Sequence, residues 1–519
     1  MASEPLDFVA GEAQRRLDGG GAIPLASATV VAFIGRTERG PLNEPVPVRS
    51  FDEYRSLFGG HCSYSFLSFA AQQFFDNGGS HAVVVRVANR AGRALLEVPA
   101  GAEVLRLQAR YPGSREFLRV SVDYDRCEQS PTRFNLVVQR LSRPGSHLIE
   151  DQELFDGLSM EQTDDRFVVD ALKDSELVRL VGPLPRVKPD ATRPERPGGP
   201  IPYVSPVAPG TDGEELTDYD IIGSDSEGTG LFALDRAGDV DYVCIPLPPG
   251  QELGMTSFVA ATRYCERHRA LLIWDPPWSW KSADAALLAI RRSGCVSSHA
   301  ITYFPRLRPR TEFNRYPGGM PACGAVAGIL ASCEREGVWQ GLAGEEAVLK
   351  GNLAPLGDLS TKQVAMLNRA GVNTFVRVLG SSHLRGNVTF AGPMAVASLW
   401  QSLSAHRVTA FILRSIERHT HWVFEVPRTV ELAAMLDRQV WIFLSRLQQR
   451  HALAGKNAEQ AFFVRTSAVQ PVGSDEAISL RIGFALRRAS EFLVFDFHYR
   501  ENGTTTEVVP VLDADRYLG

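Results

Sequence analysis

The segment from 241 to 303 constrains the fold more than any other part of the sequence. In it, short apolar runs typical of buried strands alternate with amphipathic segments typical of helices. We expect strands over 241–246, 270–276 and 298–303 and helices over 256–268 and 282–292. Strands joined by single helices pair in parallel, because each crossover helix returns the chain to the end of the sheet at which the preceding strand began. The segment therefore predicts an α/β middle domain.

Two further apolar runs near the N-terminus have the same character. They cover Thr29–Gly35 and Ala82–Val87, and each is apolar enough to be buried on both faces of a sheet. Ser50 is a good N-cap for a helix that stops at Gly59, and a second helix is expected over 66–75. These elements predict the first part of the same α/β region.

Between 91 and 180 the pattern changes to short segments of alternating polarity. Segments 104–107, 118–122 and 134–138 predict an antiparallel β module inserted into the chain. The following segment, 183–212, is dense in proline and predicts an extended surface loop.

The segment 405–466 predicts two helices and a buried strand. Val408, Phe411, Ile412 and Ile416 form one apolar face of the first helix. Another face carries a basic stripe, formed by Arg407, Arg414 and Arg418. A long helix follows from Thr429, and the buried strand covers 461–466. The basic stripe indicates either a solvated helix face or a nucleic-acid contact, although no aromatic platform interleaves it.

Strands are also expected near the C-terminus, over 480–486, 492–499 and 508–512, opposite a glycine-rich N-terminal arm. Terminal strands leave unpaired backbone edges, which either pair within the chain or accept a strand from a neighbour. A head-to-tail contact of that kind builds a helix when it does not close. The candidate residues for strands between subunits are Phe8, Val9, Phe492, Val494, Val508, Val509 and Val511.

Composition limits the other classes of function. The chain has 519 residues, 44% of them hydrophobic, a net charge of -5 and seven scattered cysteines. It is long enough for several domains, and the cysteines suit a reducing cytoplasm. No basic tail indicates nucleic-acid binding, and no apolar run is long enough for membrane insertion.

Candidate chemical sites are weak. Asp275, His299 and Ser382 follow an Asp-His-Ser order, but no serine lies in a strained G-x-S-x-G turn. Residues 223–230 are glycine-rich, yet they lack the lysine of a phosphate loop and carry acidic residues. Two pairs could bind a metal only with further ligands: Cys265 with His268 and Cys295 with His299. We therefore expect no catalytic residues, no cofactor and no metal.

The C-terminal pattern resembles contractile-tail sheath proteins. That family has a helix reading R-x-x-x-F-I-x-x-S-I, then a tryptophan-containing turn, a long helix and an A-F-F-V-R strand. The counterparts here run from Arg407 to Ile416, from Trp422 to Pro427 and from Ala461 to Arg465.

Other parts of the chain resemble the same family. Residues 32–41 and 74–87 correspond to its A-F-V-G-R-T-x-R-G-P and F-F-x-N-G-G motifs. Residues 321–328 resemble its P-x-S-G-x-x-A-G motif, with Cys323 in place of serine, and 367–373 match L-N-x-x-G-V-N. The family's usual first strand, P-G-V-Y-x-x-E, has only a poor counterpart at 8–12.

The resemblance implies a multidomain α/β and α+β chain. It implies a mixed-sheet core domain from N- and C-terminal parts, a middle α/β domain of subtilisin-like topology and an inserted antiparallel β module. The expected divisions are an arm at 1–24, the first core and middle part at 25–90, the β-rich module at 91–182, the proline-rich loop at 183–212, the middle domain at 213–400, the C-terminal sheath core at 401–500 and an arm at 501–519.

It also implies a mechanical function without catalysis. Copies of the subunit would polymerise helically in stacked hexameric rings around an inner tube and contract to drive it through a target envelope. Partners would be the tube protein, baseplate and tail terminator proteins and sister sheath proteins, in a phage tail or injection particle made in the bacterial cytoplasm. Arg407, Arg414 and Arg418 would face the tube. The alternatives are a non-contractile cap protein of this fold and an α/β hydrolase.

Overall fold

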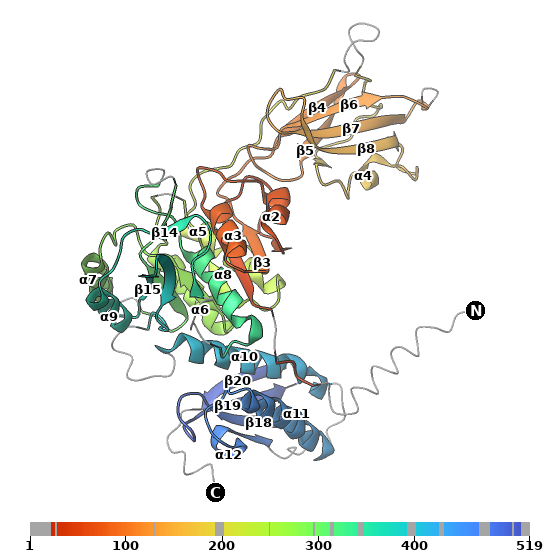
Figure 1. Cartoon of the computed structure of the whole chain (residues 1–519). Coiled ribbons are helices and arrows are strands. Elements are labelled where there is room, and N and C mark those ends of the chain that lie inside the picture. Colours follow the sequence, from red (N-terminus) through yellow and green to blue (C-terminus); the bar gives the residue numbers. More distant parts are fainter. Residues whose placement is uncertain are drawn as a thin grey trace.

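The computed structural model shows three parts arranged one above another (Figure 1). The β module is at one end, the α/β middle domain lies at the centre and the C-terminal domain is at the other end. The structure describes residues 22–25, 28–127, 130–192, 202–248, 250–293, 296–311, 316–340, 347–391, 401–424, 430–466, 478–500 and 503–509.

The middle domain is built on a mixed eight-stranded sheet of order β16-β15-β12-β11-β10-β1-β3-β2. The six inner strands pair in parallel, and only the edge strands β2 and β16 are antiparallel. The strands are β1 Val30–Gly35, β2 Pro45–Val48, β3 His81–Arg86, β10 Tyr242–Cys244, β11 Leu271–Trp274, β12 Ala300–Phe304, β15 Asn373–Val378 and β16 Ser381–Arg385. The parallel sheet predicted from the alternation of strands and helices is confirmed.

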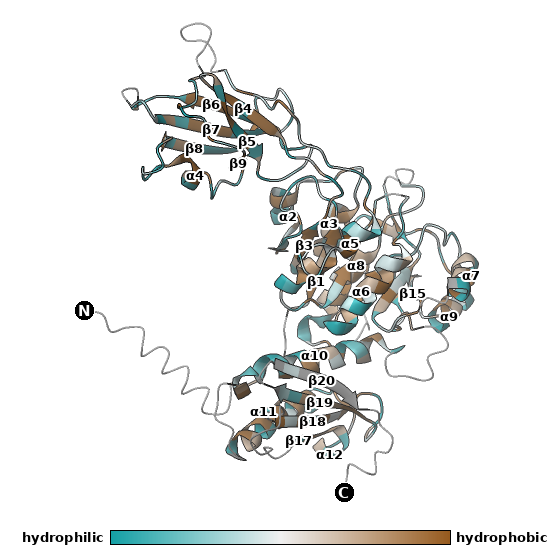
Figure 2. Ribbon diagram, turned by 180° about the vertical axis from the view of Figure 1, so that it is seen from behind, coloured by the Kyte–Doolittle hydropathy of each residue, from teal (hydrophilic) through white to brown (hydrophobic). Residues whose placement is uncertain are grey.

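Helices cover both faces of this sheet. Val31 and Phe33 of β1 pack on one face with α2 Phe51–Phe58, α3 Leu67–Asp76 and α8 Cys323–Cys333. Ala32 and Ile34 pack on the other face with α5 Asp218–Ile222, η1 Gly230–Arg236, α6 Met255–Arg267, α7 Ala283–Ser293 and α9 Thr361–Arg369. Burial on both faces explains why β1 and β3 are almost continuously apolar; both are brown in Figure 2. The domain also contains η2 Glu334–Glu336 and a hairpin of β13 Leu307–Pro309 and β14 Leu353–Pro355.

The inserted module consists of two antiparallel three-stranded sheets around one core. One sheet contains β4 Leu95–Ala100, β5 Glu103–Ala109 and β9 Val178–Leu180; the other contains β6 Leu118–Asp123, β7 Arg133–Leu141 and β8 Ile149–Ser159, beside α4 Val168–Ala171. The described parts of the proline-rich segment run along this module, because the Val204 amide donates to the Val120 carbonyl at 2.8 Å and the Thr192 amide to Val122 at 2.8 Å. These described parts are therefore extended and bound to the module.

The C-terminal domain has an antiparallel sheet of order β17-β18-β19-β20. Its elements are α10 Leu403–His419, η5 His421–Phe424, α11 Val430–Gln449, α12 Ala458–Ala461, β17 Phe462–Thr466, β18 Ile478–Ala485, β19 Phe492–Arg500 and β20 Gly503–Val509. The two predicted helices are confirmed, and the strand predicted at 461–466 forms as β17. It is not a buried strand, because β17 lies at the edge of the sheet and only Phe462 in it is buried.

Among the described residues, no sheet combines strands from the N- and C-terminal parts of the chain, contrary to our expectation. The N-terminal strands β1, β2 and β3 join strands of the middle region, and the described C-terminal strands pair only with one another. The reason is that β1 and β3 are apolar on both faces and need helices on both sides, which the middle region supplies.

Candidate assembly surfaces and the domain junction

Helix α10 joins the middle and C-terminal domains through buried ion pairs. The Arg407 guanidinium donates to the Glu334 carboxylate at 2.8 and 2.7 Å and to Asp241 Oδ1 at 3.0 Å. Two turns further along the helix, Arg414 donates to the Val240 carbonyl at 3.0 Å and also to the Asp241 carboxylate. Asp241 directly precedes β10 and Glu334 directly follows α8, so both acids belong to the middle domain.

These charges stabilise one another against the cost of burial. Burial would raise the pKa of Asp241, but Arg414 and Arg407 together lower it to about 2. Burial would also lower the pKa of Arg407, and Glu334, Tyr242 and Asp241 instead raise it well above its ordinary value. Asp241 and Arg407 therefore stay charged at neutral pH, whereas the Tyr242 hydroxyl keeps its proton and donates it to Glu334 at 2.7 Å.

The hypothesis that Arg407 and Arg414 face a tube is wrong for this chain. The Arg407 side chain is 3% exposed and that of Arg414 12%, and both are bound within the subunit. Arg418 differs, because its side chain is 58% exposed and pairs with the exposed Asp239. Spacings of seven and four residues placed the three arginines on one face of the helix, but they could not show what that face contacts.

The N-terminal segment enters the molecule at this same junction. The Thr29 hydroxyl donates to Glu334 Oε2 at 2.8 Å, and the Val30 amide donates to Asp241 Oδ2 at 2.8 Å. Ile23 lies in the C-terminal core, and its carbonyl accepts a hydrogen bond from Arg446 at 3.4 Å. Residues before β1 therefore bind both domains. Glu334 and Thr29 were missed in the sequence, although Glu334 follows an almost entirely apolar helix, which indicates burial.

The proposed strands between subunits fall into three groups. Phe492 and Val494 lie in β19, which pairs with β18 and β20 of the same chain, so the backbone of that strand is not free for a neighbour. Including these two residues was wrong, because a central strand has no open edge. Val508 and Val509 lie in β20, which pairs only with β19 in the described part of the chain. Phe8, Val9 and Val511 lie outside the described residues.

Both edges of the large sheet are closed to a further strand. β2 carries Pro45 and Pro47, which lack the amide hydrogen that a ladder requires. β16 is covered on its outer side, because Val348 forms a β-bridge with His383 and the Leu349 amide donates to the Ser382 carbonyl at 2.8 Å. Among the described sheet edges of the middle and C-terminal domains, β20 is therefore better suited to strand addition than either edge of the large sheet.

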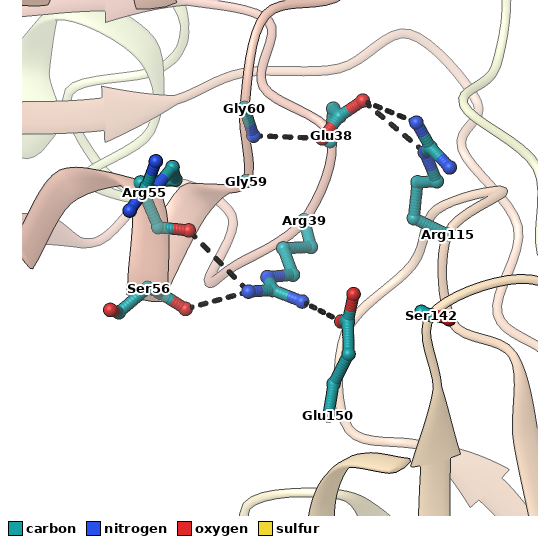
Figure 3. Close-up of a pocket in the computed structure, with 9 residues that line it drawn as sticks. All are labelled: Glu38, Arg39, Arg55, Ser56, Gly59, Gly60, Arg115, Ser142 and Glu150. Carbon is teal, nitrogen blue, oxygen red and sulfur yellow. Dashed lines mark hydrogen bonds and ion pairs between the residues drawn. The ribbon is translucent and has the colours of Figure 1, made fainter. Parts of the chain in front are cut away.

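The module meets the middle domain at a polar cavity of about 370 Å³ (Figure 3). Arg39 donates to Glu150 of the module at 2.7 Å and to the Ser56 carbonyl at 3.0 Å. Glu38 accepts from Arg115 of the module at 3.1 Å and from the Gly60 amide at 2.8 Å. The cavity is lined by charged side chains that already bind one another, so it is a joint between two parts of the subunit.

The structure does not assemble the Asp-His-Ser arrangement. Asp275 follows β11 and accepts hydrogen bonds from the amides of Ala322 and Cys323 at 2.6 and 3.0 Å. His299 precedes β12, with its ring beside that of His406 at 4.7 Å. Because the neighbouring strands β11 and β12 are parallel, Asp275 at the end of one and His299 at the start of the other lie at opposite ends of the strand pair. The two residues are therefore too far apart to form a catalytic pair.

The other candidate chemical sites are structural where the structure describes them. Residues 223–230 form the turn between α5 and η1, in which the Thr229 amide donates to the Ser224 carbonyl at 3.0 Å. Cys265 is fully buried in the core, and Cys295 lies outside the described residues. The described residues contain no cluster of three or more potential metal ligands. None of the helices in the described ranges is long and apolar enough to cross a bilayer.

No family model matches the sequence of this chain, and no curated protein matches it. Solved structures do match. A sheath tail protein from Listeria innocua is 10% identical with a TM-score of 0.64, covering 95% of this chain and 99% of that one. A sheath tail protein from Desulfitobacterium hafniense is 12% identical with a TM-score of 0.56, covering 94% and 97%.

A third similar structure comes from an assembled particle. The contracted sheath complex of PVC, an extracellular contractile injection system, is 13% identical with a TM-score of 0.52, covering 91% of this chain and 92% of that one. At such identities the likeness establishes the fold alone. The chain has the fold of sheath proteins along nearly its whole length.

Proposed function

We propose that this chain is a structural subunit of a contractile sheath. Copies polymerise helically, in stacked hexameric rings around an inner tube, and contraction drives the tube through a target envelope. The observation that carries this proposal is a fold shared with sheath proteins over more than nine-tenths of both chains. The role is mechanical rather than catalytic, and the opposite positions of Asp275 and His299 support this.

Contraction requires a lattice with two discrete packings and links that persist through the change. The open edge of β20 supports a link through Val508 and Val509, continued by Val511. The N-terminal segment is bound to the same C-terminal domain through Ile23, so an arm carrying Phe8 and Val9 would start beside that sheet. These strands are the proposed persistent links.

Arg418 remains the proposed contact with an acidic tube surface. Its side chain is the most exposed of the three arginines on α10, and its ion pair with Asp239 is half exposed, so it can exchange partners at little cost. The proposed partners are further copies, the tube, baseplate and terminator proteins and sister sheath proteins.

We place the subunit in a phage tail or injection particle, made in the bacterial cytoplasm, with neither nucleic-acid binding nor membrane insertion. The subtilisin-like topology implied by the resemblance also remains a proposal. It is supported by the order of the first seven strands of the large sheet, which is 2-3-1-4-5-6-7 when they are numbered along the chain.

Electron microscopy of the purified chain, alone and with its tube protein, tests the function. We expect helical cylinders of constant width for the full chain. Deletion of residues 1–20, or of 510–519, should abolish cylinders and leave the thermal midpoint of the monomer unchanged. Isolated rings or caps under all conditions would contradict a sheath and favour the non-contractile cap protein.

A further inference from the structure

The tip of the β15–β16 hairpin is built against the usual preferences of a tight turn. Leu379 and Gly380 alone connect the last strand pair, Val378 with Ser381. Their φ angles are +48° and +85°. Two-residue turns with both φ values positive favour Asn or Gly at the first position, because a larger side chain crowds the backbone there. Leucine is an unfavourable residue for this position.

The leucine is also fully exposed. Leu379 is 102% exposed, so it gains no burial within its own subunit, and Val378 beside it is 46% exposed. The hairpin beneath it is well held, with five residue pairs in register and an ion pair between Arg377 and Asp358 at 3.3 Å. The hairpin therefore holds an apolar side chain in solvent. The backbone conformation of Leu379 costs free energy, and no burial of its side chain offsets this cost in the isolated subunit.

We propose that Leu379, with Val378, makes an apolar contact with a second copy of this chain in the assembled sheath. This inference rests on the proposed function. A head-to-tail lattice joins one surface of a subunit to a different surface of the next copy. The hairpin lies at one end of the eight-stranded sheet; β2 and α2 lie at the other, where Leu57 is 39% exposed. The opposite flank of the next copy therefore offers an apolar counterpart.

The test is Leu379→Asn in the full chain. Asparagine suits the turn, so the denaturation midpoint of the monomer should stay unchanged or rise. The lowest concentration that forms cylinders should nevertheless increase several-fold. Leu148→Asn is the matched control, since Leu148 is 66% exposed in the module, and it should leave cylinder formation unchanged.

A second measurement reports on the contact directly. Hydroxyl-radical oxidation of Leu379 should be high in the monomer and fall strongly in cylinders. Cylinder formation by Leu379→Asn at the wild-type concentration, or equal oxidation of Leu379 in both states, would overturn the inference and leave the sheath function intact. Failure of the wild-type chain to form any cylinder would overturn both.

Discussion

At the scale of single residues, Arg407 shows how burial changes the meaning of a charge. Its guanidinium contacts two carboxylates that come from distant parts of the chain, Asp241 and Glu334. A buried ion pair adds little compared with an apolar packing, but removal of one partner leaves an uncompensated charge in the interior. The cluster therefore holds the two domains in one relative position.

Arg407→Met should lower the free energy of unfolding by about 3–5 kcal/mol, because Glu334 would lose its cationic partner. Denaturant unfolding measures this loss. Arg418→Ala is the control, since its exposed pair with Asp239 should contribute less than about 1 kcal/mol. Equal losses in the two variants would contradict the role of the cluster.

His406 predicts a pH dependence at the same junction. Burial lowers the pKa of His406 well below its ordinary value, and His299, Arg407 and Arg414 lower it further. As the pH falls, this histidine takes up a proton in the unfolded chain before it does so in the folded protein. The folded state therefore loses stability below about pH 6.5. Asp241 affects stability at lower pH. Because its pKa is depressed in the folded state, its contribution to stability is lost only as the pH falls below about 4.

We expect the wild-type thermal midpoint to fall between pH 7 and pH 5, and to fall less in His406→Asn. The quantity compared between the two proteins is the change in thermal midpoint from pH 7 to pH 5, so a difference in their stability at pH 7 does not affect the result. Part of the slope should remain, since burial also lowers the pKa of His299. Identical slopes in both proteins would show that His406 is not responsible.

At the scale of elements, the contact between α3 and α8 depends on glycine. A Cβ at Gly324 would lie 2.0 Å from the Ala70 carbonyl oxygen, and one at Gly328 would lie 2.3 Å from that of Phe74. The two helices can approach this closely only without those side chains. The sequence shows the small residues of α8 but not the helix that they contact.

Gly324→Ala should therefore destabilise the protein by roughly 1–3 kcal/mol, since the helices must move apart. This result is opposite in sign to helix propensity, which favours alanine by about 1 kcal/mol. Ala365→Gly, at an exposed site of α9, calibrates propensity alone and should cost about 1 kcal/mol. Stabilisation by Gly324→Ala in thermal or denaturant unfolding would contradict the close packing.

At the scale of the whole molecule, the β module is an insertion whose two connecting segments are hydrogen-bonded to each other. The chain enters and leaves it side by side, because Gly92 and Thr211 exchange amide hydrogen bonds of 3.1 and 2.9 Å. The module has its own core, and its ion pairs with the middle domain are partly exposed. It also lies at the opposite end of the molecule from the C-terminal domain (Figure 1).

Replacement of residues 93–210 by a short glycine-serine link should leave a folded protein with cooperative thermal unfolding. If the persistent links lie in the C-terminal domain, this variant should still form cylinders, and they should be narrower in electron micrographs. A folded variant that forms no cylinders would show that the module carries lattice contacts.

The sequence by itself determined the elements and the fold class. Continuous apolar runs such as Val30–Gly35 identified strands buried on both faces, and signals such as Ser50 and Gly59 identified where a helix begins and ends. These features are local, so a window of a few residues contains the information. The order of motifs along the chain likewise indicated the sheath fold.

Only the tertiary structure decided which surfaces are free. It showed that Arg407 is buried against Asp241 and Glu334, that β19 is an interior strand and that β1 joins the middle sheet. Each of these facts depends on groups far apart in the sequence, because a charge or a strand edge is available only when no distant segment covers it. Local periodicity places a side chain on a face, and long-range packing determines what that face meets.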